Sequence, residues 1–105
     1  MTAVTRREKL EAMLAGSPHD QMLRYMLAME FDKESDYDRS LEMFDGLMKD
    51  TPPYVPAFLM AGQLLARLSR TEEARATYQT GIHEAQQQHN DHAAGEMAGF
   101  LQELQ

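Results

Sequence analysis

The chain has 105 residues, of which 43% are hydrophobic and 26% are charged, and its formal net charge is −7. A chain of this length predicts one domain over residues 1–105, and the acidic balance excludes nucleic acid and anionic membranes as partners, because both would repel it. The absence of cysteine excludes disulfides, thiolate catalysis and cysteine-bound zinc. The first residues lack the apolar core of a signal peptide, so we expect a cytoplasmic protein.

Six short helices are predicted in chain order, because apolar residues recur at helical spacing and the alternation typical of strands never persists. Gly16 ends the first helix. Side-chain oxygens of Asp20, of Ser35 or Asp36, and of Thr71 are placed to cap the second, third and fifth helices. The predicted ranges are about 6–15, 21–32, 36–49, 56–68, 71–89 and 91–104.

The first and last helices each carry an apolar stripe, which predicts that one face of each packs on the rest of the chain. In the first helix the stripe contains Leu10, Met13 and Leu14. In the last helix it contains Ala93, Met97, Phe100, Leu101 and Leu104.

The central part of the chain resembles itself at an offset of 34 residues. Small residues and aromatic residues recur at the same places in both copies. A fixed period in this range indicates stacked repeats, in which one unit cannot bury its apolar face alone. The recurring pairs are Ala28 and Gly62, Phe31 and Leu65, Ser40 and Ala74, Phe44 and Tyr78, and Met48 and Ile82.

In this register the segment 21–88 resembles two tetratricopeptide repeats, 21–54 and 55–88. The resemblance implies an all-α fold of antiparallel helical hairpins stacked in a right-handed superhelix. The helices at 5–15 and 91–104 would then cap its two ends. The matching residues are Leu27, Ala28, Phe31, Tyr37, Ser40, Phe44, Leu47 and Pro52 in the first unit and Phe58, Gly62, Leu65, Ala74 and Tyr78 in the second.

Three residues depart from the family pattern. Arg24 stands where an aromatic residue is usual, Gly81 replaces an alanine-like residue, and Gln86 replaces a closing proline. The missing proline favours a longer fifth helix. We expect the core to contain four aromatic residues: Phe44, Phe58, Tyr78 and Phe100.

In this family the first helix of each unit lines a concave surface that binds other proteins. Carried over by position, that surface is rich in methionine, whose flexible side chain adapts to apolar partners such as an amphipathic helix or an extended peptide. The lysine, asparagine and arginine with which some members clamp a C-terminal carboxylate are absent from these positions. The candidate partner-binding residues are Met22, Tyr25, Met26, Met29, Lys33, Leu59, Met60, Gln63 and Arg67.

The predicted function is therefore that of a protein–protein interaction module, an adaptor or scaffold without enzymatic activity or cofactor. No nucleophile elbow, phosphate loop or dinucleotide fingerprint is present. Two alternatives stay open for the methionines: they could be core residues covered by the first helix, or they could form a homodimer interface in an assembly. The acidic stretch at 30–45 lacks the glycine and the bidentate glutamate of a calcium loop, and the histidines at 83–92 form no His-Glu-x-x-His motif. We expect both groups to be solvated; an ion site, for example at His92 and Glu96, which are four residues apart, is the less favoured alternative.

Overall fold

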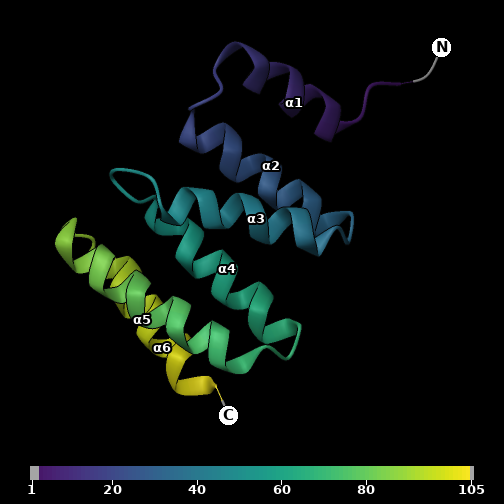
Figure 1. The fold of residues 1–105 in the computed structure, drawn as a ribbon. Coiled ribbons are helices and arrows are strands. Elements are labelled where there is room, and N and C mark those ends of the chain that lie inside the picture. Colours follow the sequence, from purple (N-terminus) through teal and green to yellow (C-terminus); the bar gives the residue numbers. More distant parts are fainter. Residues whose placement is uncertain (1–2, 105) are drawn as a thin grey trace.

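The computed structural model describes residues 3–104 as six α-helices joined by short turns, with no strand in that range. The all-α fold predicted from the sequence is confirmed. Successive helices fold back on one another, and the stack advances from α1 at the N-terminal end to α6 at the C-terminal end (Figure 1). The helices are α1 (Arg6–Gly16), α2 (Gln21–Lys33), α3 (Tyr37–Met48), α4 (Val55–Arg67), α5 (Thr71–Gln87) and α6 (Asp91–Glu103).

Side-chain caps at the starts of α2 and α3 are those that the sequence predicts. The Asp20 carboxylate accepts a hydrogen bond from the Leu23 amide at 2.9 Å, and the Asp36 carboxylate accepts one from the Arg39 amide at 3.3 Å. The predicted cap at Thr71 is wrong. Thr71 is the first helical residue of α5, and the preceding Arg70 makes no side-chain cap hydrogen bond. The Arg70 amide bonds back to the end of α4, so one tight turn joins the two helices.

The ends of α2, α4 and α5 share one motif. Ser35, Ser69 and His89 each have φ near +60°, the left-handed region that favours glycine. In each case two amides bond back to the last turn of the helix, as in the Ser69 amide to the Ala66 carbonyl and the Arg70 amide to the Leu65 carbonyl. These are Schellman motifs, which satisfy helix-end carbonyls at the cost of a strained backbone when the residue has a Cβ.

Replacement of Ser69 by glycine should therefore stabilise the protein by about 1 kcal/mol, because glycine adopts a positive φ without steric cost. The matched control is Ser69→Ala, which removes the same hydroxyl but keeps the Cβ. Chemical denaturation should give a higher midpoint for Ser69→Gly only. Equal midpoints for the two variants would contradict the left-handed conformation at Ser69.

The core is a row of three apolar clusters along the stack. An N-terminal cluster contains Leu10, Leu27 and Phe31. A middle cluster forms around Phe44, and a C-terminal cluster forms around Phe58 and Tyr78. The burial of Phe44, Phe58 and Tyr78 that we expect from the sequence is confirmed, since none is more than 3% exposed.

Two core predictions are wrong in part. Phe100 is only partly buried, because its ring borders an open pocket between α4 and α6. Met13 is 56% exposed, so the stripe on α1 is narrower than predicted. Of that stripe, Leu10 is buried and Leu14 packs at the edge of the N-terminal cluster.

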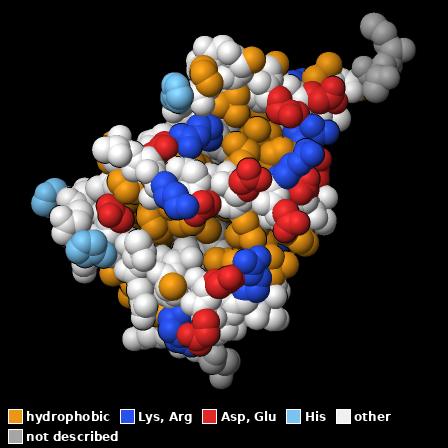
Figure 2. All heavy atoms as spheres, viewed as in Figure 1, with side chains coloured by type: hydrophobic (Ala, Val, Ile, Leu, Met, Phe, Trp, Pro, Cys, Tyr) orange, Lys and Arg blue, Asp and Glu red, His pale blue; other side chains and the backbone are white. Residues whose placement is uncertain are grey.

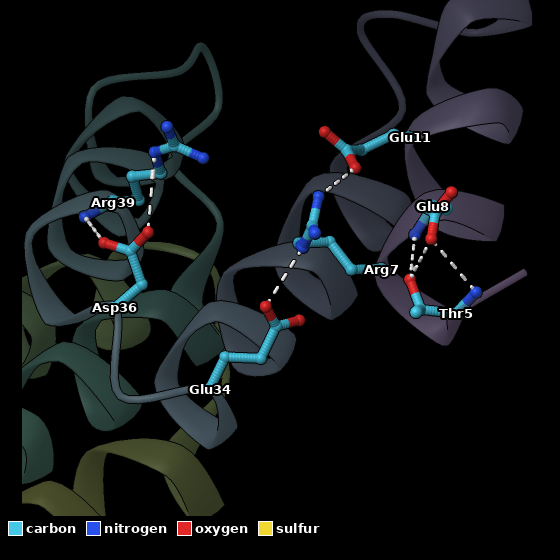
Figure 3. A network of polar contacts seen from close by, with 7 residues as sticks. All are labelled: Thr5, Arg7, Glu8, Glu11, Glu34, Asp36 and Arg39. Atoms are coloured by element: carbon cyan, nitrogen blue, oxygen red, sulfur yellow. Dashed lines mark hydrogen bonds and ion pairs between the residues drawn. The ribbon is translucent and has the colours of Figure 1, made fainter.

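Helix α1 packs on α2, and ion pairs add to the contact that Leu10 makes. Arg7 lies between Glu11 of its own helix and Glu34 after α2, at 2.7 and 3.0 Å (Figure 3). At the start of α1, Thr5 and Glu8 cap each other's backbone amides. The exposed ion pairs orient α1 but contribute little stability, because solvent screens them.

Two glycines allow helices to approach closely. A Cβ on Gly62 of α4 would lie 2.3 Å from Cε1 of Tyr78. A Cβ on Gly81 of α5 would lie 2.5 Å from Cβ of Phe58 and 2.6 Å from Sδ of Met97. The departure from the family pattern at Gly81 is thus explained by its packing, because α4 and α6 both press on α5 at that residue.

Candidate functional site

Helices α2, α4 and α6 form one face of the stack, which we call the α2–α4–α6 face. An ion pair joins Asp32 in the last turn of α2 to Arg67 at the end of α4, with 2.6 Å between Oδ2 and Nη2. Helix α6 contacts α4 as well as α5, and a pocket lies between α4 and α6. A second hollow lies between α3 and α5, on the other layer of helices.

The candidate residues of α2 do not share one environment. Tyr25 and Met29 are partly buried against the middle cluster, and Met26 is partly buried against the N-terminal cluster, to which α1 contributes Leu10. Met22 is 63% exposed and Lys33 is also exposed. Met26 and Met29 therefore lie against the core clusters with only part of each side chain exposed, whereas Met22 is mostly open to solvent.

Tyr25 lies within a group of aromatic rings. Its ring centroid is 5.4 Å from that of Tyr54 and 6.1 Å from that of Phe44, and both ring pairs are tilted. Burial raises the pKa of the Tyr25 phenol. The ring is held in place by these contacts, and such a rigid aromatic side chain suits an anchor for a partner at low entropic cost.

The candidate residues of α4 fall into two groups. Leu59 packs on the C-terminal cluster and Met60 on the middle cluster, each partly buried. Gln63 and Arg67 line the pocket between α4 and α6. Of these four residues, the structure thus brings Gln63 and Arg67 together in a cavity and places Leu59 and Met60 along the core clusters.

The pocket between α4 and α6, which we call the α4–α6 pocket, has a volume of about 360 Å³. Sequence reasoning missed most of its lining, because it assigned Tyr78 and Phe100 to the core and α6 to a cap. The order of the helices held a usable signal: a helix that follows two hairpins takes the place of a third unit's first helix and so faces α4. The pocket is lined by Gln63, Ala66, Arg67, Tyr78, Phe100, Glu103 and Leu104.

Tyr78 reaches this pocket from α5, on the other layer. Its ring passes over Gly62, where any side chain would collide with it, and stacks on Phe100 with 6.2 Å between ring centroids. Burial and the nearby Glu103 carboxylate both raise the pKa of the Tyr78 phenol. The glycine therefore opens the gap through which an aromatic ring of α5 contributes to the α2–α4–α6 face.

The acidic residues near α2 and α3 mostly have basic neighbours. The Glu30 carboxylate lies 3.2 Å from Arg6 and 3.9 Å from Lys33, and Asp45 lies 2.9 Å from Lys49. Figure 2 shows acidic and basic side chains next to one another on this side of the molecule, with apolar atoms in the bands between them. Within residues 3–104 no group of three histidine, aspartate or glutamate side chains is close enough to hold a metal ion.

A polar hollow of about 600 Å³ lies where α2 begins, and Arg24 is one of its lining residues. The contacts of Arg24 there explain why a charged residue replaces the aromatic residue usual in the family. Arg24 and Gln21 both donate hydrogen bonds to the Asp50 carboxylate, which follows the end of α3. These two hydrogen bonds hold the pKa of Asp50 below its usual value. A charged side chain thus takes the place of an aromatic one, and it ties the start of α2 to the α3–α4 turn.

None of the helices in the described range is long and apolar enough to cross a membrane. No protein-family model and no curated protein sequence matches the chain.

Two solved structures resemble the protein along most of its length. A solution structure from Bordetella parapertussis is 26% identical, with a TM-score of 0.79, and the match covers 98% of this chain and 88% of that one. The solution structure of a tetratricopeptide repeat domain protein from Salinibacter ruber is 32% identical, with a TM-score of 0.77, over 82% of this chain and 87% of that one. The repeat of 34 residues predicted this fold, and the Salinibacter ruber protein shares both the fold and 32% of the sequence. The chain belongs to the tetratricopeptide repeat family.

Proposed function

We propose that the protein is an interaction module, an adaptor or scaffold that binds an apolar helix or peptide of another protein on the α2–α4–α6 face. The observation that carries this proposal is the α4–α6 pocket, an apolar hollow on the face that the family uses for binding. A pocket of about 360 Å³ lies at the lower end of the ~300–1,000 Å³ range of ligand sites, so it fits one or two side chains of a partner.

The partly buried methionines extend this site along α2 and α4. Met26, Met29 and Met60 each leave part of a flexible thioether side chain open, which suits adaptable apolar contacts. Affinity would come from burial of the partner's apolar side chains, while Lys33 and Arg67 at the edge set its orientation. No catalytic step is proposed.

A pair of alanine-to-tryptophan variants tests the proposed face. Ala66 lines the α4–α6 pocket, whereas Ala76 is exposed on α5 and lines a separate hollow on the other layer of helices, which also contains Met48 and Lys49. Peptides are selected from a random phage-displayed library on the wild-type protein, and their affinities are measured by fluorescence anisotropy. Ala66→Trp should fill the pocket and weaken binding at least about tenfold, and Ala76→Trp should leave it unchanged. Selected peptides that Ala66→Trp binds as tightly as the wild type does would argue against this face.

A homodimer is the second candidate, and one observation favours it. The large apolar side chains that are more than half exposed among residues 3–104 are Val4, Met13 and Met22, and all three lie at the α1 end of the stack. Sedimentation at increasing concentration tests this candidate. A mass that rises to twice the monomer and falls with Met13→Glu would favour a dimer through this end.

A further inference from the structure

The Tyr78 hydroxyl has no hydrogen-bond partner within residues 3–104, although the residue is only 1% exposed. Tyr78 lines the α4–α6 pocket, and among residues 3–104 no side-chain oxygen that is fully shielded from solvent lacks a partner, so we place its hydroxyl oxygen at the pocket surface. Packing explains the ring but not the hydroxyl, since phenylalanine would fill nearly the same volume. A polar group on the wall of an apolar pocket can bond a ligand.

Gln63 offers a second polar group on the same pocket. Its side chain is partly buried and makes no hydrogen bond to another described residue. An amide and a hydroxyl together present donors and acceptors, the set that a peptide backbone requires. Ala66, Phe100 and Leu104 supply the apolar walls beside them.

The pocket contains one carboxylate, that of Glu103, with no ion-pair partner among residues 3–104. Arg67 is already paired with Asp32, whereas Glu103 is exposed. The chain as a whole carries a net charge of −7, which steers basic partners toward it. A cation of the partner placed next to Glu103 would therefore complement the site.

We propose that the α4–α6 pocket binds a single large apolar side chain of a partner segment, with a lysine or arginine beside it that pairs with Glu103. The Tyr78 hydroxyl and the Gln63 amide bond the backbone of that segment. This inference rests on the proposed function, since it names the chemistry of the partner that the α2–α4–α6 face binds. Specificity then comes from a pocket at the α6 end, while the methionines of α2 add less selective contacts.

A charge exchange tests the basic residue of the partner. Random peptides are selected on the wild-type protein and, in parallel, on Glu103→Lys. We expect wild-type selections to enrich a large apolar residue next to lysine or arginine, and Glu103→Lys selections to enrich the apolar residue next to aspartate or glutamate. Each selected peptide should bind the exchanged protein about tenfold more weakly. Selections with the same charge preference on both proteins would overturn the role of Glu103.

Removal of one oxygen tests the role of Tyr78. Tyr78→Phe should leave the melting temperature unchanged, because the hydroxyl bonds no residue among 3–104, and should weaken binding of the selected peptides about three- to tenfold. A hydroxyl with a merely structural role would lower the melting temperature and leave affinity alone.

Different results would overturn the proposed binding face and the inferred partner chemistry. If Ala66→Trp abolishes binding but Tyr78→Phe and Glu103→Lys change nothing, the inferred partner chemistry is overturned and the proposed function stands. If the selected peptides bind Ala66→Trp as they bind the wild type, or no peptide is enriched on a folded protein, the proposed function fails and the inference fails with it.

Discussion

Replacement of Phe44 by alanine should destabilise the protein by about 3–5 kcal/mol, a large share of the ~5–15 kcal/mol typical of a native protein. Phe44 is fully buried in the middle cluster, where it packs beside Leu47, Ala61 and Leu64. The lost stability is the sum of two free energies, the transfer free energy of the ring and the cost of the cavity that it leaves. The middle cluster also joins the α2–α3 and α4–α5 hairpins, so the cavity would weaken the stack at its centre.

The control for this variant is Phe100→Ala, the same chemical change at a partly buried ring. We expect it to cost less than half as much, because solvent already contacts the ring and the site can collapse. Urea denaturation followed by circular dichroism gives both values. If Phe44→Ala were to unfold at the wild-type denaturant concentration, the assignment of Phe44 to the core would be wrong.

The second large effect is expected at Gly62. An alanine there would place its Cβ 2.3 Å from Cε1 and 2.6 Å from Cζ of Tyr78, a ring that is itself buried. Overpacking of this kind costs about 1–3 kcal/mol, and the better helix propensity of alanine returns roughly 0.5–1 kcal/mol. We therefore expect net destabilisation of up to about 2.5 kcal/mol. Tyr78 would also shift in the α4–α6 pocket, so peptide binding should weaken together with stability.

Gly99 provides the matched control for Gly62. It also lies within a helix, but a Cβ there would meet no atom of the described chain within 4 Å. Gly99→Ala should stabilise the protein by about 0.5–1 kcal/mol, so the same substitution has opposite signs at the two positions. The melting temperatures of both variants are compared with that of the wild type. A higher melting temperature for Gly62→Ala would contradict the contact between α4 and Tyr78.

Much of the fold could be predicted because each repeat places the same kinds of residue at the same packing positions. Small residues at Ala28, Gly62 and Ala74 mark close helix contacts, and aromatic residues at Phe44 and Tyr78 fill the spaces between. Local rules were reliable where a side chain caps its own helix, as at Asp20. They failed at Thr71, where the end of α4 runs directly into α5 and the turn is stabilised by backbone hydrogen bonds.

The candidate site was harder to predict, because exposure depends on which helices are neighbours. The position of Tyr78 in the repeat predicts a core residue, and its ring is buried. That its hydroxyl meets a pocket follows from the gap at Gly62 and from the position of α6, neither of which a helix pattern encodes. Phe100 contributes to that pocket because it belongs to the last helix of the stack. Binding by the methionines of α2 stays a prediction.

An NMR map of the bound state would locate the partner on the protein. A ¹⁵N-labelled wild-type protein is titrated with a peptide selected on it, and the amide shifts are assigned along the chain. We predict the largest changes around the α4–α6 pocket, near Gln63, Ala66, Phe100 and Leu104, with smaller changes along α2. Changes confined to α3 and α5, with α4 and α6 unmoved, would contradict the account.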